Sequence, residues 1–350
     1  MPAGTVLARG KVERISGPDD YRRALSGLLA DYGDALHAIG LKAVHAGPRF
    51  RGTFHITEDV LDALREFEPA APLHNSIYIA AIETLRSLAP QIPLVAVFET
   101  GFHRTMPEAA SIYGVPRQWL DDFGVRRYGF HGASHRFVSE RVPELLGRPA
   151  GRLVSCHLGG SSSICAIRDG ASIDTTMGFS PQSGLENATR HGELDPFAVL
   201  LVMERRNWSP ARMREELLRH GGLAGLSGIV GGDVRDLEAA ATPDARLALE
   251  VFSYQVRKTI GAYAAALGGV DAIAFTGGIG ENSASLRESC CRDLEFLGVR
   301  LDRERNRHET GDRLVSPDDA PVKVLALATN EELIVARETY RALLRPHSEP

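Results

Sequence analysis

Two glycine-rich segments lie beside apolar strand patterns and could bind phosphate. Thr276 to Asn282 (TGGIGEN) follows the apolar run Ala272–Phe275, and His157 to Ser163 (HLGGSSS) lies between two strand patterns. Glycines let a ligand approach the backbone, and successive N–H groups and hydroxyls can face one anion. Neither segment is a Walker A loop or a G-x-G-x-x-G fingerprint. Each is also compatible with a tight turn that binds nothing, but two such turns together favour phosphate.

Two cationic side chains are candidates for contact with the transferred group. His131 lies between glycines in GFHGASH, and Arg190 lies in TRHG after a long polar segment. A guanidinium offers a planar fork to phosphoryl oxygens, and an imidazolium can add a second charge. A histidine in this setting is also compatible with a capping or core role. We expect His135, four residues further on, to be structural.

Three carboxylates are candidates for the site. Glu99 ends the buried strand pattern Leu94–Phe98, and the carboxyl ends of such strands line the ligand crevice in many α/β proteins. Thr329 and Glu332 have the spacing of a capping box, which favours a capping role for Glu332. Glu331 would then be available to hold a cation near a phosphate.

The elements that must position these residues alternate between strands and helices, which indicates mainly parallel, helix-covered sheets. The second part opens with three short strands separated by turn signals, the order of a ribonuclease-H-like half. The expected strands are 41–45, 94–98, 153–157, 163–167, 171–175, 272–275 and 322–326, with a possible strand or hairpin in 6–15. The expected helices start near 18, 58 and 77, cover 196–205, 210–219, 243–267 and 283–296, and close the chain from 329.

Composition and charge exclude several function classes. The 350 residues, 43% of them apolar, are enough for two domains. A net charge of −5 provides no basic field for nucleic acid or an anionic membrane, and no apolar run approaches the roughly 18–20 residues that span a bilayer. Four cysteines are too few for a disulfide framework in a chain of this size. We therefore expect a cytoplasmic enzyme with no nucleic-acid or membrane partner.

Six segments, in this order, resemble the acetate/propionate kinase (acetokinase) family. They are GFHRTMPE from Gly101, RRYGFHGASH from Arg126, CHLGGSSS from Cys156, DTTMGFSPQSGL from Asp174, FTGGIGENS from Phe275 and TNEELIVARET from Thr329. The resemblance runs from about Val6 to Leu344, nearly the whole chain. Several motifs of this length in one order are highly specific.

The resemblance implies an α/β fold of the acetate and sugar kinase/Hsc70/actin type. We expect two ribonuclease-H-like domains with an interdomain cleft, residues 1–100 plus 333–350 forming the N-terminal domain and residues 101–332 the nucleotide-binding C-terminal domain. The family also implies ATP, Mg²⁺, a homodimer, and reversible phosphoryl transfer between ATP and a short-chain carboxylate.

Matching the family's motifs residue by residue implies site roles. The catalytic residues match Glu99, His131 and Arg190, and the magnesium-binding glutamate matches Glu331. The residues that match the carboxylate site are Lys42, Val44, Leu73, His74, Phe130 and Pro181, of which Val44, Leu73, Phe130 and Pro181 match the small apolar pocket for the acyl methyl. The residues that match the nucleotide site are His157, Leu158, Gly159, Gly160, Ser161, Asp233, Val234, Arg235, Gly278, Ile279, Gly280, Glu281 and Asn282.

This sequence departs from the family pattern in four places, and the first three departures indicate a divergent branch. Glu99 replaces an aspartate, Lys42 replaces an arginine, and Gly160-Ser161 replaces Asn-Gly. None of these changes removes a charge that the site needs. The family also opens with a strand, an Asn-x-Gly-Ser-Ser-Ser-x-Lys-type turn and a return strand, and no such pattern precedes Val6. A start codon assigned too late and a genuine short form both explain this difference.

The leading interpretation is ATP-dependent, reversible phosphorylation of acetate or propionate to the acyl phosphate. The alternative is a catalytically inactive nucleotide-binding homologue on the same scaffold, which Lys42, Gly160 and the missing first turn motivate. A sugar kinase would fit the fold but not the apolar pocket or the GFHRTMP segment.

Overall fold

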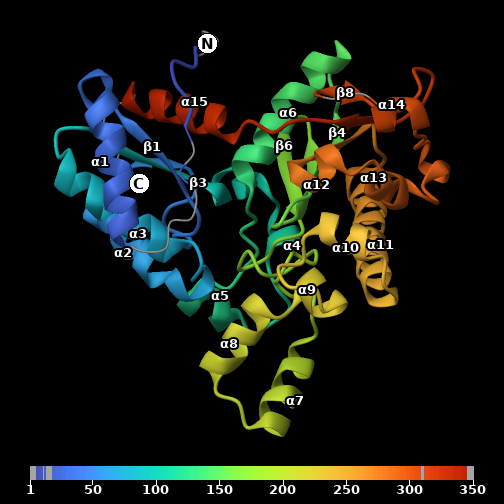
Figure 1. The fold of residues 1–350 in the computed structure, drawn as a ribbon, viewed down its shortest axis with the longest axis horizontal. Coiled ribbons are helices and arrows are strands. Elements are labelled where there is room, and N and C mark those ends of the chain that lie inside the picture. The colour runs from blue at the N-terminus through green and yellow to red at the C-terminus, as the bar shows by residue number, and fades with distance from the viewer. Residues whose placement is uncertain (1–4, 11, 13–17, 309–310, 345–350) are drawn as a thin grey trace. The chain divides into compact units, whose positions relative to one another are not determined.

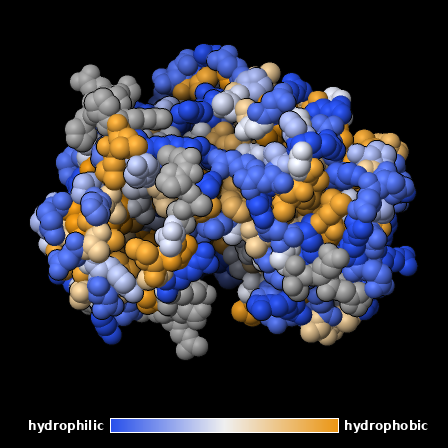
Figure 2. All heavy atoms as spheres, turned by 90° about the horizontal axis from the view of Figure 1, so that it is seen from above, coloured by the Kyte–Doolittle hydropathy of each residue, from blue (hydrophilic) through white to orange (hydrophobic). Residues whose placement is uncertain are grey.

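The computed structural model describes residues 5–10, 12, 18–308 and 311–344. Two compact units divide the chain: unit 1 is Met1–Arg104 with Asn330–Pro350, and unit 2 is Thr105–Thr329. Each unit has its own sheet (Figure 1). Figure 2 shows a mostly hydrophilic face with separate hydrophobic groups on it. Among the described helices, none has the length and apolar character that crossing a membrane requires.

Unit 1 contains a three-stranded sheet with helices on both faces. Its strands lie in the order β1-β3-β2, with β1 parallel and β2 antiparallel to β3. Helix α15 packs against one face, and helices α2 and α3 contribute to the core on the other. The elements are α1 (Pro18–Tyr32), η1 (Gly33–Ala35), β1 (Ile39–Ala43), β2 (Thr53–His55), α2 (Glu58–Glu66), η2 (Glu68–Ala70), α3 (Asn75–Leu88), β3 (Leu94–Phe98), η3 (Glu99–Thr105) and α15 (Glu331–Leu343).

Strand β3 is the central strand of this sheet, and helices cover both of its faces. All five of its residues are buried, as expected for a strand between two helical layers. Val95 and Val97 pack with Val335 of α15, whereas Ala96 and Phe98 belong to the core on the opposite face. The covered strand therefore delivers the next residue, Glu99, at a buried position.

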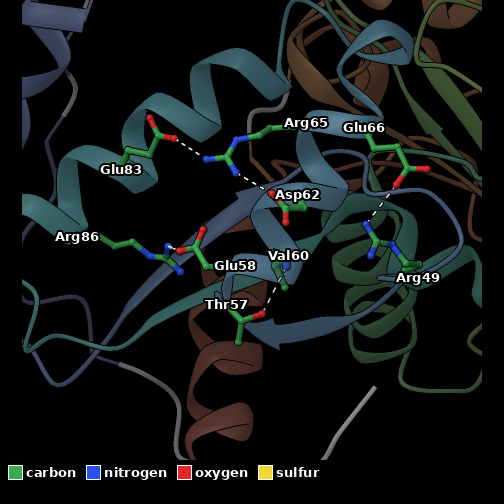
Figure 3. A network of polar contacts seen from close by, with 9 residues as sticks. All are labelled: Arg49, Thr57, Glu58, Val60, Asp62, Arg65, Glu66, Glu83 and Arg86. Atoms are coloured by element: carbon green, nitrogen blue, oxygen red, sulfur yellow. Dashed lines mark hydrogen bonds and ion pairs between the residues drawn. The ribbon is translucent and has the colours of Figure 1, made fainter.

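Helix α2 begins where its sequence predicts and is joined to α3 by an ion pair. The Val60 N–H donates to Thr57 Oγ1 at 3.4 Å, which satisfies a helix-end donor (Figure 3). Arg65 of α2 contacts Glu83 of α3 at 2.8 Å on the exposed side. Leu61, on the inner side of α2, is buried. Burial of this inner face stabilises the helix pair, and the exposed ion pair helps to orient it.

Unit 2 contains a six-stranded sheet in the order β6-β5-β4-β7-β9-β8. Strands β4, β5 and β6 form the predicted antiparallel meander, and β4, β7 and β9 run parallel to one another. The elements are α4 (Glu108–Ser111), α5 (Arg117–Phe123), α6 (Gly132–Leu146), β4 (Arg152–His157), β5 (Ser163–Arg168), β6 (Ala171–Thr175), α7 (Pro196–Arg206), α8 (Pro210–Arg219), α9 (Gly222–Ser227), α10 (Val234–Ala240), α11 (Pro243–Leu267), β7 (Ala272–Thr276), α12 (Gly277–Asn282), α13 (Ala284–Cys291), η4 (Glu295–Leu297), α14 (Arg303–His308), β8 (Arg313–Leu314) and β9 (Lys323–Ala326).

Helix α11 provides most of the helical side of the unit 2 core. Thr242 caps its start by accepting from the Ala245 N–H at 3.2 Å, and Gly268, with φ 71°, ends it in the left-handed region. Its buried residues, among them Phe252 and Val256, pack against β4 and β5. The predicted 25-residue helix is confirmed in both bounds.

Three local predictions are wrong. The glycine-rich turn after β7 is the short helix α12, and the helix expected over 283–296 ends at Cys291. The capping box at Thr329 is absent, because Asn330 Oδ1 accepts from the Leu333 N–H at 3.0 Å and caps α15 instead. The strand or hairpin expected in 6–15 lies partly outside the described residues, and residues 5–10 are not in a strand.

We expect Phe252→Ala to lower the free energy of unfolding of unit 2 by about 3–5 kcal/mol, because it leaves a cavity in a fully buried site. Both tryptophans, Trp119 and Trp208, belong to unit 2, so their fluorescence during urea denaturation reports on this unit. Leu247→Ala, at a 52% exposed position of the same helix, is the control and should change stability by less than about 0.5 kcal/mol. Equal effects of the two substitutions would contradict the assignment of the core.

Candidate active site

His131 and His157, both predicted for the site, lie against each other. Their ring centroids are 4.2 Å apart and the rings are inclined by 27°. His157 ends β4, and His131 immediately precedes α6. His131 has φ 56°, a left-handed backbone that residues with a Cβ rarely adopt. Because such strained conformations concentrate at functional sites, this backbone supports the prediction for His131.

Serine hydroxyls link His131 to a second, fully buried histidine. Ser163 Oγ lies 2.8 Å from His131 Nδ1 and 2.8 Å from His135 Nε2. On the other side of that ring, Ser155 Oγ lies 2.9 Å from His135 Nδ1. A hydroxyl has one proton to donate, so Ser163 can donate to only one of these two ring nitrogens. The other nitrogen must carry a proton and donate to the Ser163 oxygen. His135 is fully buried, which agrees with the structural role expected of it, and that role stays a prediction.

The two glycine-rich segments meet at the carboxyl ends of neighbouring parallel strands. In the β4–β7 pair, His157 lies opposite Thr276. Leu158 donates its N–H to the Thr276 carbonyl at 2.8 Å and accepts from the Ile279 N–H at 2.9 Å. Gly277 has φ 77°, and a Cβ there would lie 2.6 Å from the Leu158 carbonyl oxygen. This close approach requires glycine, and it brings the predicted phosphate and nucleotide segments together.

A buried arginine that the sequence analysis missed holds the second of these segments. Arg287 is 1% exposed, and its Nη1 donates to the carbonyls of Gly280 and Glu281, each at 2.8 Å. Its Nε and Nη2 donate to the side chain and backbone of Asn306. Burial, helped by nearby Arg313, lowers the pKa of Arg287 to about 10. Two carbonyls of α12 and two oxygens of Asn306 thus bind this guanidinium, which links α12 to α14.

Arg190 is a buried cation without a carboxylate partner among the described residues. It is 7% exposed, and Nη1 donates to the Pro181 carbonyl at 2.7 Å. Burial lowers its pKa to about 10, because the charged form has lost most of its hydration. An anion at this guanidinium would restore the lost stabilisation of the charge. The Ala188 N–H donates to the Gly160 carbonyl at 3.0 Å, which joins the Arg190 segment to His157–Ser163, the predicted phosphate loop.

The segment predicted to contact adenosine caps helix α10. Asp233 accepts from the Arg235 N–H at 2.9 Å and pairs with its guanidinium at 2.6 Å, which lowers the pKa of Asp233 to about 2. Val234 is 5% exposed and packs in the core, so the ion pair provides the accessible polar groups. Glu238 accepts from the Ser283 hydroxyl at 3.2 Å, which places α10 beside the residues that follow α12.

In unit 1, Lys42 and Glu331 form an ion pair at the N-terminus of α15. Lys42 Nζ lies 2.5 Å from Glu331 Oε2, and both residues line a cavity of about 480 Å³ between β1 and α15. Burial opposes the charge on Lys42, but the carboxylates of Glu99 and Glu331 outweigh it and raise the pKa of Lys42. Glu99 is 4% exposed. Three residues predicted separately thus form one electrostatic cluster.

The other residues predicted for the carboxylate site are divided between the units. Val44, Leu73 and His74 belong to unit 1, and Phe130 and Pro181 to unit 2. Val44, Phe130 and Pro181 are buried, and Leu73 and His74 are half-buried. Phe130 precedes His131, and the Pro181 carbonyl binds Arg190. The acyl pocket that these residues would form stays a prediction.

We expect Ser163→Ala to shift the ring ¹⁵N resonances of both His131 and His135, because it removes a contact to each ring. It should also lower the free energy of unfolding by about 1–3 kcal/mol, since the buried His135 ring and the half-buried His131 ring each lose one hydrogen-bond contact. Ser155→Ala is the matched control: it removes a contact to His135 alone and should leave the His131 resonances in place. Spectra of His-labelled protein in which neither substitution moves His131 would refute the network.

Comparison with known proteins identifies the family. The acetokinase family model matches residues 25–337. The chain is 42% identical to the acetate kinase of Carboxydothermus hydrogenoformans, across 97% of this chain and 94% of that protein. It is 44% identical to the acetate kinase of Thermotoga maritima, across 87% of this chain and 77% of that protein.

Solved structures agree with this assignment and confirm the predicted fold class. The crystal structure of Porphyromonas gingivalis acetate kinase superposes with a TM-score of 0.85 at 36% identity, covering 94% of this chain and 85% of that one. A propionate kinase from Francisella tularensis gives a TM-score of 0.85 at 34% identity, covering 91% and 83%. The fold is thus that of the acetate and sugar kinase/Hsc70/actin class, and the chain belongs to the acetokinase family.

Proposed function

We propose that the protein catalyses ATP-dependent, reversible phosphorylation of a short-chain carboxylate, acetate or propionate, to the acyl phosphate. Membership of the acetokinase family supports this reaction, and the relatives named above are acetate and propionate kinases. The single observation that carries the proposal is the buried Arg190 guanidinium, which has no carboxylate partner among the described residues and whose segment is bonded to the glycine-rich loop. No comparison favours a catalytically inactive homologue.

Arg190 and His131 are proposed to stabilise the phosphoryl group during transfer. Negative charge on this group is spread over its equatorial oxygens, so catalysis depends on positioning and on electrostatic stabilisation. A buried guanidinium acts strongly on such charge because little water screens it. The Ser163 contact and the stacking on His157 hold the His131 ring in one orientation, which spares the enzyme from reorganising it during the reaction.

Glu331 is the proposed protein ligand of Mg²⁺. Mg²⁺ prefers oxygen donors and often takes one or two carboxylates together with substrate phosphates and water, so a single glutamate fits this use. Glu331 Oε2 accepts from Lys42 Nζ at 2.5 Å, so Mg²⁺ at this carboxylate would have to share it with the ammonium or displace the ammonium. When bound, Mg²⁺ neutralises phosphate charge and orients the phosphates.

In unit 1, Lys42 and His74 are proposed to bind the charge of the carboxylate substrate, and Val44 and Leu73 are proposed to contact its alkyl group. Lys42 provides the point charge: it is ion-paired with Glu331, and the carboxylates of Glu99 and Glu331 raise its pKa and keep it protonated. An apolar pocket distinguishes one methylene by only about 1–3 kcal/mol. Acetate and propionate should therefore both be substrates, with unequal kcat/KM.

The test of this function is trapping of the acyl phosphate with hydroxylamine in the presence of acetate or propionate, ATP and Mg²⁺. We expect Arg190→Ala to lower kcat by about 10²–10³-fold with little change in thermal unfolding, because it removes charge stabilisation in the transition state. Arg219→Ala, at an exposed position of α8, is the matched control and should retain activity. Absence of hydroxamate with the unmodified chain would reject the function, and near-normal kcat of Arg190→Ala would reject the site.

The homodimer implied by the family is proposed to form through helix α7. None of the 11 residues of α7 is buried. Phe197, Leu200 and Leu201 are 78%, 51% and 53% exposed, and their i, i+3, i+4 spacing places them on one face. Exposed apolar stripes of this kind are typical of interfaces. A second copy presents the same stripe, so a two-fold dimer would cover both.

We expect Leu200→Glu combined with Leu201→Glu to convert the dimer to a monomer in sedimentation equilibrium, because charges would be buried without partners at the interface. Phe296→Glu, at a 78% exposed apolar position outside α7, is the matched control and should remain dimeric. A dimer that survives the double substitution would place the interface elsewhere.

Two further assignments are proposed with this function. We assign unit 1 and unit 2 as the N-terminal and C-terminal ribonuclease-H-like domains of the family fold, each with its own sheet. We also place the enzyme in the cytoplasm. The four cysteines support this location, because all are buried free thiols, as is usual in a reducing compartment.

A further inference from the structure

Asn187, to which the family's motifs assign no role, is a fully buried side chain with bonds to two functional segments. Its Oδ1 accepts from the backbone N–H of Ser162 at 2.8 Å, within the phosphate loop. Its own N–H donates to the Arg190 carbonyl at 3.1 Å. Its Nδ2 donates to the Leu185 carbonyl at 3.3 Å, and its carbonyl accepts from the Leu223 N–H at 2.9 Å. All of its polar groups are therefore engaged.

A second bond beside Asn187 joins the same two segments. The next residue, Ala188, donates its N–H to the Gly160 carbonyl at 3.0 Å. The phosphate loop is thus held at two positions, by the Asn187 side chain at Ser162 and by the Ala188 backbone at Gly160. Because both bonds come from consecutive residues, the loop and the turn that ends at Arg190 form one hydrogen-bonded assembly.

The backbone around Asn187 leaves little space for adjustment. Gly222 has φ 61°, and a Cβ there would lie 2.2 Å from the Asn187 carbonyl oxygen. Gly232 has φ 60°, and a Cβ there would lie 2.2 Å from the Ala188 carbonyl oxygen. Only glycine tolerates these approaches, so the turn is enclosed by neighbouring backbone. A change of the Asn187 side chain must therefore be taken up by the phosphate loop or by the Arg190 turn.

We propose that Asn187 is a positioning residue that fixes the Arg190 guanidinium relative to the phosphate loop. Phosphoryl transfer requires the cation and the phosphate-binding backbone to meet one group, and a displacement of about 1 Å can cost roughly a hundredfold in rate. Asn187 does not itself need to touch substrate. The kinetic test of this role rests on the proposed function, whereas the hydrogen–deuterium exchange test does not.

The kinetic test is Asn187→Leu, which keeps the size of the side chain and removes the acceptor for the Ser162 N–H. We expect kcat to fall by at least about tenfold. The KM for the carboxylate should stay within about threefold, because the variant leaves the proposed carboxylate contacts in unit 1 unchanged. Ser316→Ala is the matched control: it removes a hydroxyl that accepts from the buried Val324 N–H at 3.1 Å, away from the site, and should leave kcat unchanged.

A double-mutant cycle with Arg190→Ala separates positioning from general destabilisation. If Asn187 acts through Arg190, then Asn187→Leu should change kcat by less than about threefold once the guanidinium is gone. Equal fold-losses in the two backgrounds would overturn the proposal, as would near-normal kcat of Asn187→Leu alone. An inactive unmodified chain would instead reject the proposed function.

Hydrogen–deuterium exchange of the unmodified chain tests the structural part independently of activity and of the folding of any variant. We expect the Ser162 amide to exchange at least about a hundredfold more slowly than the amide of Gly160, for which no acceptor is present among the described residues. In Asn187→Leu, the Ser162 amide should lose this protection while peptides of α11 keep theirs. Rapid exchange at Ser162 in the unmodified chain would overturn the proposal.

Discussion

Parallel pairing of β4 with β7 is the constraint on which the unit 2 site depends. Parallel neighbours end at the same edge of a sheet, so this one pairing places the residues after His157 beside the residues after Thr276. Leu158 then bonds to both segments, and Gly277 permits the approach that these bonds need. His131, at the start of α6, and the turn that ends at Arg190 contact the residues at this edge of the sheet.

Unit 2 also contains two buried arginines whose hydrogen-bond partners are uncharged. Arg287 and Arg190 are both almost fully buried, and their hydrogen bonds go to carbonyl and amide oxygens. Arg287 makes four such bonds, two to carbonyls of α12 and two to Asn306, which is a structural use of the charge. Arg190 has a single protein acceptor among the described residues, which leaves most of its donors available to a ligand. The number of hydrogen bonds that each guanidinium makes to the protein therefore distinguishes a supporting arginine, Arg287, from a candidate catalytic one, Arg190.

Much of the fold could be predicted from the sequence because local signals agreed with the tertiary structure. Thr57 and Thr242 cap the helices that were expected to start near residues 58 and 243, and Gly268 ends α11. One wrong prediction concerns a helix start that a long-range contact decides. Thr329 has the local pattern of a cap, but its hydroxyl donates to Ser134 at 3.1 Å, far away in the sequence, and Asn330 caps α15 instead.

The sequence alone determined the alternation of strands and helices, the glycines at the strand ends, and the histidine and arginine motifs that identify the family, because these depend on residue type and short-range spacing. Tertiary structure alone decided which of these residues are held together. Ser163, which contacts His131, and Asn187, which bonds to Ser162 of the predicted phosphate loop and to Arg190, have no local pattern of their own. Their roles arise from hydrogen bonds between segments that only the folded sheet brings into contact.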